Sequence, residues 1–308
     1  MSERINDPGF GAKYERKTKR IINHDGSFNV RRKGVDTGLR SLYEALIGMK
    51  LLPFLGVVLA TYLLLNAFFA TLYFLNGVEH LQGATPDSLF DEWLTCFFFS
   101  FQTFTTVGYG FLSPMGMTAN FIAAVEALCG LLGFALATGL LYGRFSKPRA
   151  KLIYSKNALM SPFKDGKALM FRVANKRSNV LMQMEATVIL MLKDDPMIPH
   201  QRSYYRLDLQ VSRIHFLPLS WTIVHPVTEE SPFFGKTPEE LIKKEAELLI
   251  LITGFDDTFN QIVHSRFSYT CEEFVHDAKF KIPYEIDTAG DIVLDIEDIN
   301  AYKLTNTA

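Results

Sequence analysis

From residue 51 to residue 143 the chain contains no lysine and no arginine, although the whole chain has 32 of these residues. Within this stretch, Leu51–Val78 carries no charged side chain and Met117–Gly143 carries only Glu126. Apolar helices of these lengths can cross a hydrocarbon layer about 30 Å thick. Trp93–Phe104, between them, is apolar but too short to cross, so we expect a re-entrant helix there. The sequence therefore predicts a membrane unit at 51–146, with spanning helices at 51–76 and 117–145 and a pore helix at 91–104.

A segment with two glycines, Thr106-Val107-Gly108-Tyr109-Gly110, follows Thr105 between the pore helix and the second spanning helix. In potassium channels, four copies of a Thr-Val-Gly-Tyr-Gly segment direct rings of backbone carbonyls at a common axis, and these oxygens replace the hydration shell of the ion. Such rings need alternating backbone dihedrals, which glycine tolerates. We therefore expect residues 105–110 to form a selectivity filter, with potassium bound at Thr106, Val107, Gly108 and Tyr109.

The charge distribution predicts how the chain lies in a membrane. Residues 1–50 hold 11 Lys and Arg against 6 Asp and Glu, whereas residues 77–92 hold acidic side chains and no Lys or Arg. By the positive-inside rule, both termini then lie in the cytoplasm and the acidic connection lies outside. The first apolar run begins only near residue 45, which argues against a cleavable signal peptide. We expect a multi-pass protein of the plasma or inner membrane.

The sequence gives no support to several other classes of function. The formal net charge of -1 favours no polyanionic partner such as nucleic acid. The three cysteines are odd in number, and Cys96 and Cys129 lie in the apolar stretch, so no disulfide framework is expected. The sequence has no nucleophile–base pattern, no phosphate-binding glycine loop and no histidines at metal-ligand spacing. We therefore expect neither an enzyme nor a cofactor, and potassium only as a permeant ligand.

Two polar regions precede the first spanning helix. Residues 1–38 are rich in charged and turn-forming residues, and we expect a mobile cytosolic tail with a short strand around Ser27–Val30. Residues 39–50 place apolar side chains at helical spacing, which predicts an amphipathic helix that lies at the membrane surface. The alternative is that residues 39–50 simply extend the first spanning helix.

The composition changes after Arg144. Residues 147–151 form a basic linker, and residues 152–300 contain short β-type runs separated by turn clusters. Thr237 followed by Pro238 predicts the start of one helix over Pro238–Ala246. Many short strands with few helices indicate an all-β sandwich. The expected strands are Ala168–Ala174, Ala186–Leu192, Ser203–Leu209, Trp221–Val224, Glu247–Thr253 and Gln261–Tyr269.

One carboxylate and a periodic stripe distinguish the second spanning helix. A lone carboxylate near hydrocarbon costs about 2.5 kcal/mol or more, so we expect Glu126 to face protein and accept hydrogen bonds behind the filter, where Thr105 also supports it. The alternative is a carboxylate at the outer surface.

A stripe of side chains recurs every four residues along the same helix. If this stripe faces the axis, its aromatic rings narrow the conduit and gate it by dewetting. One alternative is that the aromatic rings face lipid. Another is that Gly130 allows close packing and is not a hinge. The stripe consists of Gly130, Phe134, Thr138 and Tyr142.

Further motifs occur in Phe145–Pro148, Phe171–Arg177, Trp221–Pro226, Ser231–Gly235 and Ser265–Tyr269. In their order and spacing the chain resembles the prokaryotic inward-rectifier potassium channels, from about Leu39 to Asp287. The resemblance implies a homotetramer. It also implies a fold in which two transmembrane helices, a re-entrant pore helix and a filter are followed by a cytosolic all-β immunoglobulin-like sandwich that extends the pore.

The resemblance also suggests how conduction is controlled. It places the bundle-crossing aromatic at Tyr142 and a pore-lining position at Phe134. Strongly rectifying animal members have Asp or Asn at the latter position, so weak rectification is expected here. The Glu–Arg pair that braces the filter in animal members is replaced by Gln102 and Leu112, so that bracing is expected to be absent.

Basic residues near the cytoplasmic membrane face suggest a contact with lipid. Each basic residue near an anionic leaflet contributes about 1 kcal/mol. One interpretation is that these basic residues only determine the topology of the chain and attract lipid headgroups nonspecifically. The family likeness at Arg144, Lys147 and Arg149 implies instead a site for anionic phospholipid that is coupled to gating. Lys151 follows them closely in the sequence, and Arg40 and Lys50 of the expected interfacial helix join them at the membrane surface.

Residues 254–263 match the cytosolic pore-lining loop of the family. This loop contains Gly254, and Asp256 and Asp257 would place up to eight carboxylates around a tetrameric vestibule and concentrate cations there. The alternative is a pair of solvated turn aspartates. The predicted function is a tetrameric potassium channel gated at the inner helix bundle and by the cytosolic domain. The competing prediction is a membrane-anchored binding module whose pore is silent.

Overall fold

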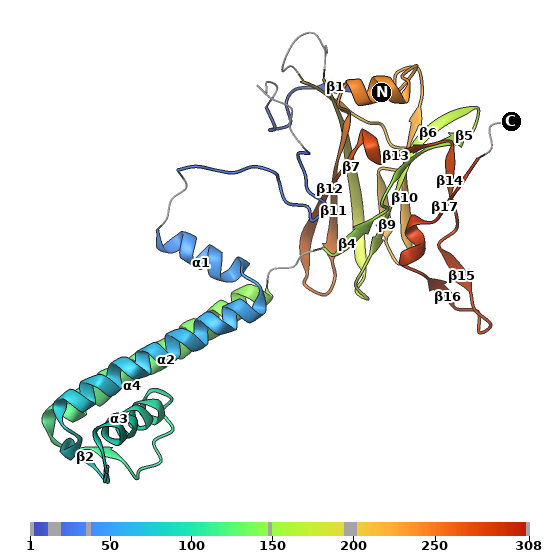
Figure 1. The fold of residues 1–308 in the computed structure, drawn as a ribbon. Coiled ribbons are helices and arrows are strands. Elements are labelled where there is room, and N and C mark those ends of the chain that lie inside the picture. The colour runs from blue at the N-terminus through green and yellow to red at the C-terminus, as the bar shows by residue number, and fades with distance from the viewer. Residues whose placement is uncertain (1–2, 12–19, 35–37, 147–149, 194–201, 306–308) are drawn as a thin grey trace. The chain divides into compact units, whose positions relative to one another are not determined.

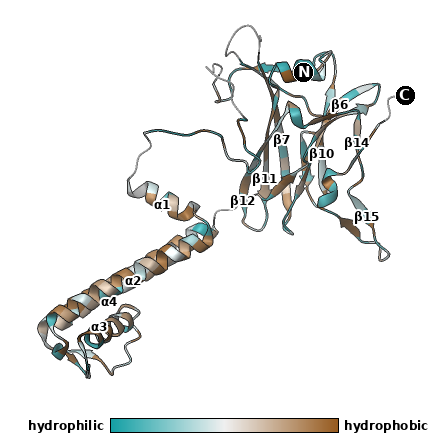
Figure 2. Ribbon diagram, in the orientation of Figure 1, coloured by the Kyte–Doolittle hydropathy of each residue, from teal (hydrophilic) through white to brown (hydrophobic). Residues whose placement is uncertain are grey.

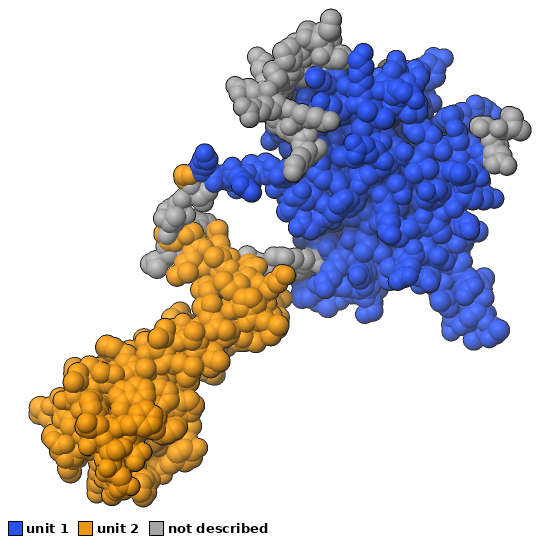
Figure 3. Space-filling model, in the orientation of Figure 1, with its two compact units in different colours: residues 1–33, 148–308 blue, residues 34–147 orange. Residues whose placement is uncertain are grey.

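The computed structural model describes residues 3–11, 20–34, 38–146, 150–193 and 202–305. The chain divides into two compact units (Figure 3), which are residues 34–147 and residues 1–33 together with 148–308. The first unit, called here the pore unit, is helical, and the second, the β unit, is built mainly from β-sheets (Figure 1). The predicted fold class, a helical membrane unit followed by an all-β unit, is confirmed.

Two long helices dominate the pore unit. Helices α2 (Leu51–Asn76) and α4 (Gly116–Phe145) are, among the described residues, the helices long and apolar enough to cross a membrane (Figure 2). They lie against each other, and α3 packs on both. The range of α2 equals the predicted range, and α4 starts one residue earlier than predicted. Hydropathy thus fixes these two elements almost to the residue.

A short helix, α1 (Leu39–Gly48), precedes α2. Met49 and Lys50 between the two helices are extended, with ψ angles of 153° and 154°. The helical hydrogen-bond ladder is therefore interrupted, and residues 39–50 do not simply extend α2. Leu42 and Tyr43 on α1 are more than half exposed, at 56% and 51%, as expected for a helix with an apolar face.

The pore helix α3 (Leu89–Phe104) begins two residues before the predicted start. Ser88 is its N-cap, and the Ser88 hydroxyl accepts a hydrogen bond from the Asp91 N–H at 3.3 Å. Asp91 and Glu92 lie in the first turn, where negative charge interacts favourably with the helix dipole. The connections around α3 contain η1 (Val78–His80) and the small pair β2 (Leu81–Gln82) and β3 (Ser113–Pro114).

The β unit consists mainly of two sheets. The first has the strand order β1-β8-β7-β11-β12, with β9 also paired to β7, and the second has the order β10-β6-β5-β13, with β4 also paired to β6. The strands of the first sheet are β1 (Glu3–Ile5), β7 (Leu181–Lys193), β8 (Arg202–Arg206), β9 (Arg213–Phe216), β11 (Glu247–Asp256) and β12 (Gln261–Thr270). Those of the second are β4 (Leu152–Tyr154), β5 (Ala158–Phe163), β6 (Gly166–Asn175), β10 (Ser220–Val227) and β13 (Phe274–His276).

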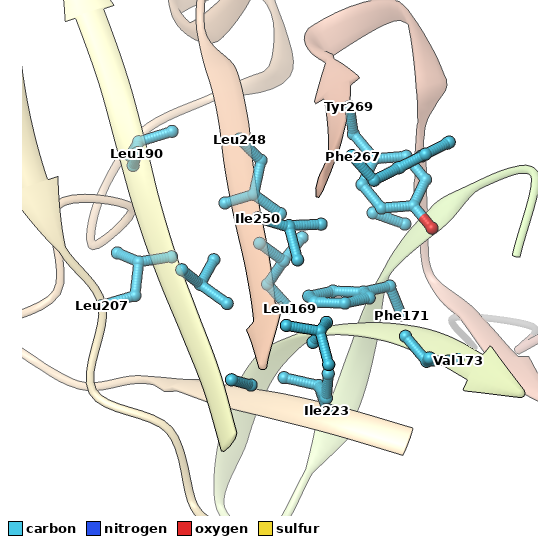
Figure 4. Packing of buried hydrophobic residues seen from close by; sticks show 14 of the residues in the cluster. Leu169, Phe171, Val173, Leu190, Leu207, Ile223, Leu248, Ile250, Phe267 and Tyr269 are labelled. Atoms are coloured by element: carbon cyan, nitrogen blue, oxygen red, sulfur yellow. The ribbon is translucent and has the colours of Figure 1, made fainter. Parts of the chain in front are cut away.

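One hydrophobic core fills the space between these two sheets. Figure 4 shows Phe171 and Ile223 from the second sheet pointing toward Ile250 from the first. Each of these three side chains is at most 2% exposed. The alternation of buried and exposed residues along the strands, which the sequence pattern predicts, places one face of each sheet in this core.

The six predicted strands all lie within these sheets, although Ser203–Leu209 extends beyond β8, which ends at Arg206. The predicted helix is shorter than expected, because α5 (Pro238–Lys243) ends before Glu245, whose φ of 46° is not helical. Its start is as predicted, since Thr237 forms a capping box with Glu240. The remaining elements are short: η2 (Cys271–Glu273), β14 (Ala278–Phe280), β15 (Tyr284–Ile286), β16 (Ile292–Leu294), η3 (Glu297–Asn300) and β17 (Tyr302–Leu304).

The expectation of a mobile tail over residues 1–38 is wrong for much of its described part. Strand β1 pairs antiparallel with β8, and Ile21 and Ile22 are buried at 6% and 3% exposure against the first sheet. The Ile21 N–H donates to Glu247 Oε1 at 2.9 Å. The expected strand around Ser27–Val30 is only a single bridge, between Ile22 and Phe28. Residues 20–30, called here the N-terminal strap, are thus part of the β unit.

Candidate functional site

The candidate filter follows directly from the end of the pore helix. Thr105 caps α3, and its hydroxyl donates to the Phe101 carbonyl at 2.8 Å. Beyond it, φ is positive at every second residue, with values of 58° at Thr106, 51° at Gly108 and 85° at Gly110. The two glycines were expected to take this conformation. Thr106 takes it as well, which is rare for a β-branched residue and typical of strained functional sites.

Gln102 holds the filter segment to the pore helix. Its backbone carbonyl accepts hydrogen bonds from the N–H groups of Val107 at 2.9 Å and Gly108 at 3.3 Å. Its side-chain Oε1 accepts a third hydrogen bond, from the Tyr109 N–H at 3.2 Å. Three filter amides are thus fixed from behind by one residue, while residues 105–110 are exposed in the single chain. Gln102, a neutral residue, thus braces this segment from the end of the pore helix.

Glu126 lies inside the pore unit and not at its outer surface. The residue is 0% exposed, and its Oε2 accepts a hydrogen bond from the Tyr73 hydroxyl at 2.6 Å. Its Oε1 lies within hydrogen-bond distance of the Ser100 hydroxyl. The carboxyl group therefore joins α2, α3 and α4 behind the filter, while the hydroxyl of Thr105 is bonded to its own helix. Tyr73 and Ser100 were not singled out from the sequence, because one tyrosine and one serine in apolar helices carry no pattern.

Gly130 is explained by packing, the alternative to a hinge. A Cβ atom at this position would lie 2.1 Å from the Phe104 carbonyl oxygen, so only glycine lets α4 approach the end of the pore helix this closely. The other members of the stripe are exposed in the single chain, with 75% exposure for both Phe134 and Tyr142. Thr138 lies between them on the same exposed face. These three side chains are therefore available to line a conduit formed by several copies of α4.

The basic residue at the end of α4 contacts protein groups. Arg144 Cζ lies 5.5 Å from the centroid of the Phe54 ring, and Arg144 Nη1 donates to the Leu46 carbonyl at 3.5 Å. One residue earlier, a Cβ at Gly143 would lie 3.3 Å from the side chains of both Ile47 and Tyr43. The ends of α1 and α4 are thus in close contact.

The other residues of the expected lipid site are less fully described. Lys147 and Arg149 lie outside the described residues, and so does the side chain of Arg40. Lys151 is exposed. The contacts of Arg144 with α1 and α2 give it a structural role in addition to any contact with headgroups.

The expected vestibule loop is a hairpin between β11 and β12. Asp256 is 1% exposed, and its Oδ1 accepts hydrogen bonds from the N–H groups of Thr258 at 3.1 Å and Phe259 at 3.4 Å. The expectation that Asp256 faces a vestibule is therefore wrong, because its carboxylate holds the turn. Asp257 is exposed, so at most one carboxylate per chain at these two positions remains available. Gly254 lies against Met184, whose Sδ would be 2.1 Å from an added Cβ.

Comparison with known proteins adds an independent line of evidence. The family described as inward rectifier potassium channel C-terminal domain matches residues 152–307, and the family described as ion channel matches residues 57–147. The chain is 36% identical over 275 residues to the inward rectifier potassium channel Kirbac3.1 of Paramagnetospirillum magnetotacticum, which covers 88% of this chain and 91% of that protein. It is 25% identical to the human G protein-activated inward rectifier potassium channel 2, with coverage of 86% and 68%. It is also 25% identical to the ATP-sensitive inward rectifier potassium channel 12 of Gallus gallus, with coverage of 90% and 70%.

Proposed function

Because this chain belongs to the inward rectifier potassium channel family, we propose that four copies assemble around one axis into a potassium-selective channel of the plasma or inner membrane, with both termini in the cytoplasm. The observation that carries this proposal is the filter backbone. Positive φ at Thr106, Gly108 and Gly110 alternates with the residues between them, as required when successive carbonyls point at one axis. Closure of such rings needs several copies arranged with cyclic symmetry.

We place the gate at the cytoplasmic end of α4. Phe134, Thr138 and Tyr142 form an exposed face of this helix, and four aromatic rings converging there would close a conduit by excluding water. Position 134 holds a phenylalanine and not a carboxylate or amide side chain, which supports weak block of the pore by internal cations. The packing of α1 on Gly143 and Arg144 supports control by the membrane surface, since a displacement of α1 would act on α4 at this contact.

We propose anionic phospholipid as the regulating ligand. The basic residues Arg144, Lys147, Arg149 and Lys151 follow one another at the end of α4, where the positive-inside rule places the cytoplasmic leaflet. The exposed Asp257 would contribute four carboxylates to the cytosolic end of the conduit and raise the local concentration of cations.

Flux measurements on purified protein in liposomes test the proposal. We expect potassium-driven flux that barium blocks, from a particle with the mass of four 34.9 kDa chains. Gly108→Ala should abolish this flux without changing the mass, because alanine in the left-handed conformation costs roughly 1–2 kcal/mol in every subunit. Gly166→Ala is the matched control, since Gly166 has no positive φ and no atom near the added Cβ. A tetramer without flux would instead favour a membrane-anchored binding module with a silent pore.

A further inference from the structure

Four polar side chains form a closed cluster inside the pore unit. Asn66 and Tyr73 on α2, Ser100 on α3 and Glu126 on α4 are each 0% or 1% exposed. No lysine or arginine occurs between residues 51 and 143, and the side chains that form hydrogen bonds with Glu126, those of Tyr73 and Ser100, are not basic. The cluster also lies beside Tyr62 and Cys96, which are ordinarily uncharged at neutral pH.

The hydrogen-bond donors in this cluster can be counted. Tyr73 uses its single hydroxyl proton on Glu126 Oε2, at 2.6 Å. The Asn66 amide nitrogen donates to the Tyr62 carbonyl at 2.8 Å. Ser100 has one hydroxyl proton, but its oxygen lies near three acceptors: Glu126 Oε1, the Asn66 backbone carbonyl at 3.1 Å and Asn66 Oδ1 at 3.2 Å. One proton cannot serve all three contacts.

The protonation state of Glu126 decides whether these contacts can be satisfied. If the carboxyl is ionised, Ser100 must donate to it, and none of the four side chains has a donor left for Asn66 Oδ1. If Glu126 carries a proton on Oε1, it donates to Ser100 Oγ, and Ser100 in turn can donate its single proton to Asn66 Oδ1. Only the protonated form produces a continuous chain of hydrogen bonds, and it also avoids a buried charge without a counter-ion.

We propose that Glu126 is a neutral carboxylic acid that donates through Ser100 to Asn66, and that this relay fixes the pore helix between α2 and α4. Ser100 lies one helical turn before Phe104, after which the filter begins. Ser100 and Asn66 are thus positioning residues for the filter, because they set the place of the helix that carries it. The inference rests on the proposed function only in its effect on selectivity.

Infrared difference spectroscopy tests the protonation state directly, whether or not the protein conducts. The spectrum of the native tetramer minus that of Glu126→Gln should contain the C=O stretching band of a protonated carboxylic acid. Both samples must have the tetramer mass. Absence of this band, with a carboxylate band in its place, would overturn the proposal.

Two variants, each of which lacks one hydroxyl group of α3, test the role of the relay. Ser100→Ala breaks the relay, and we expect its potassium-over-sodium permeability ratio to fall by about tenfold, the equivalent of one lost hydrogen bond at the upper end of the usual range. Thr103→Ala is the matched control, since the Thr103 hydroxyl donates to the Phe99 carbonyl of its own helix. Glu126→Gln keeps an N–H donor toward Ser100 and should retain most of the selectivity.

The outcomes separate the two proposals. If the native protein carries no potassium flux but the acid band is present, the proposed function fails and the neutral Glu126 stands. If flux is normal and Ser100→Ala is as selective as Thr103→Ala, the relay is not a positioning element and this inference fails. A similar loss in both variants would also contradict it, because any missing hydroxyl on α3 would then have the same effect.

Discussion

Gln102 and Tyr109 are joined across the turn from pore helix to filter, with the Gln102 side-chain oxygen 3.2 Å from the Tyr109 nitrogen. The same residue accepts two further filter N–H groups at its backbone carbonyl. A side chain near the end of a helix thereby fixes the direction of a backbone amide on the proposed filter segment, and with it the orientation of the adjoining carbonyls.

Gln102→Ala should therefore loosen the filter without unfolding the pore unit. The Tyr109 N–H loses an acceptor worth about 1 kcal/mol in each subunit, so we expect the potassium-over-sodium permeability ratio to fall several-fold. Gln102→Glu keeps an acceptor oxygen at the same place and should remain selective. Bi-ionic flux measurements in liposomes distinguish the two variants. Equal selectivity of Gln102→Ala and the native protein would contradict this role.

Tyr142→Ala should raise the resting flux and leave potassium-over-sodium preference unchanged. In the proposed tetramer, removal of four rings where four helices converge should leave an opening wide enough to stay wet. Leu136→Ala is a suitable control, because Leu136 is 70% exposed on the same helix but does not belong to the stripe. An unchanged resting flux in a tetrameric Tyr142→Ala protein would place the constriction elsewhere, with Phe134 as the next position to test.

Neutralising Arg144, Lys147 and Arg149 together should weaken binding to vesicles that contain anionic phospholipid. Because each charge contributes about 1 kcal/mol, the affinity for these vesicles should fall by roughly 100-fold at low salt. The lipid dependence of flux should flatten in parallel. A variant with Lys164, Lys279 and Lys303 neutralised carries the same charge change on exposed positions of the β unit and serves as the control. If both variants respond fully to lipid, the basic residues determine topology alone.

The stability of the β unit should fall below neutral pH because of His225. Burial lowers the pKa of His225 to about 4, and the side chain is 3% exposed between the Asp208 carbonyl at 2.6 Å and the Ser231 hydroxyl at 2.8 Å. The unfolded chain takes up the proton at about pH 6.5, before the folded chain does. Stability is therefore complete above about pH 6.5 and decreases toward pH 4, by up to roughly 3 kcal/mol for each chain.

Thermal unfolding of the purified protein between pH 7.5 and 4 measures this effect. The midpoint temperature of His225→Gln should depend less on pH than that of the native protein. His264→Gln, which changes an exposed histidine, should keep the native pH dependence. Parallel curves for the native protein and His225→Gln would show that another group is responsible for the pH dependence.

The two spanning helices could be predicted because hydropathy and length alone determine them, and α2 occupies the predicted residues. The positive φ angles of Gly108 and Gly110 were equally predictable, since these glycines stand in a short local pattern. The roles of Gln102 and Asp256 were not accessible, because each is set by a hydrogen bond to backbone groups whose position only the folded chain defines. The network around Glu126 joins three helices and likewise has no local pattern.

The N-terminal strap was missed for a related reason. Its buried side chains, Ile21 and Ile22, are surrounded by polar and charged residues, so their sequence resembles that of a solvated tail. Their partners on the first sheet lie far along the chain. Local composition therefore predicted mobility where a distant contact supplies the burial.

The bond between the Ile21 N–H and Glu247 Oε1 joins residues that are 226 positions apart. During synthesis, the surface that receives the strap does not exist until β11 has left the ribosome. By then the whole segment that enters the bilayer has already been translated. Docking of the strap can thus begin only after both apolar helices have been translated, although the strap itself precedes them in the chain.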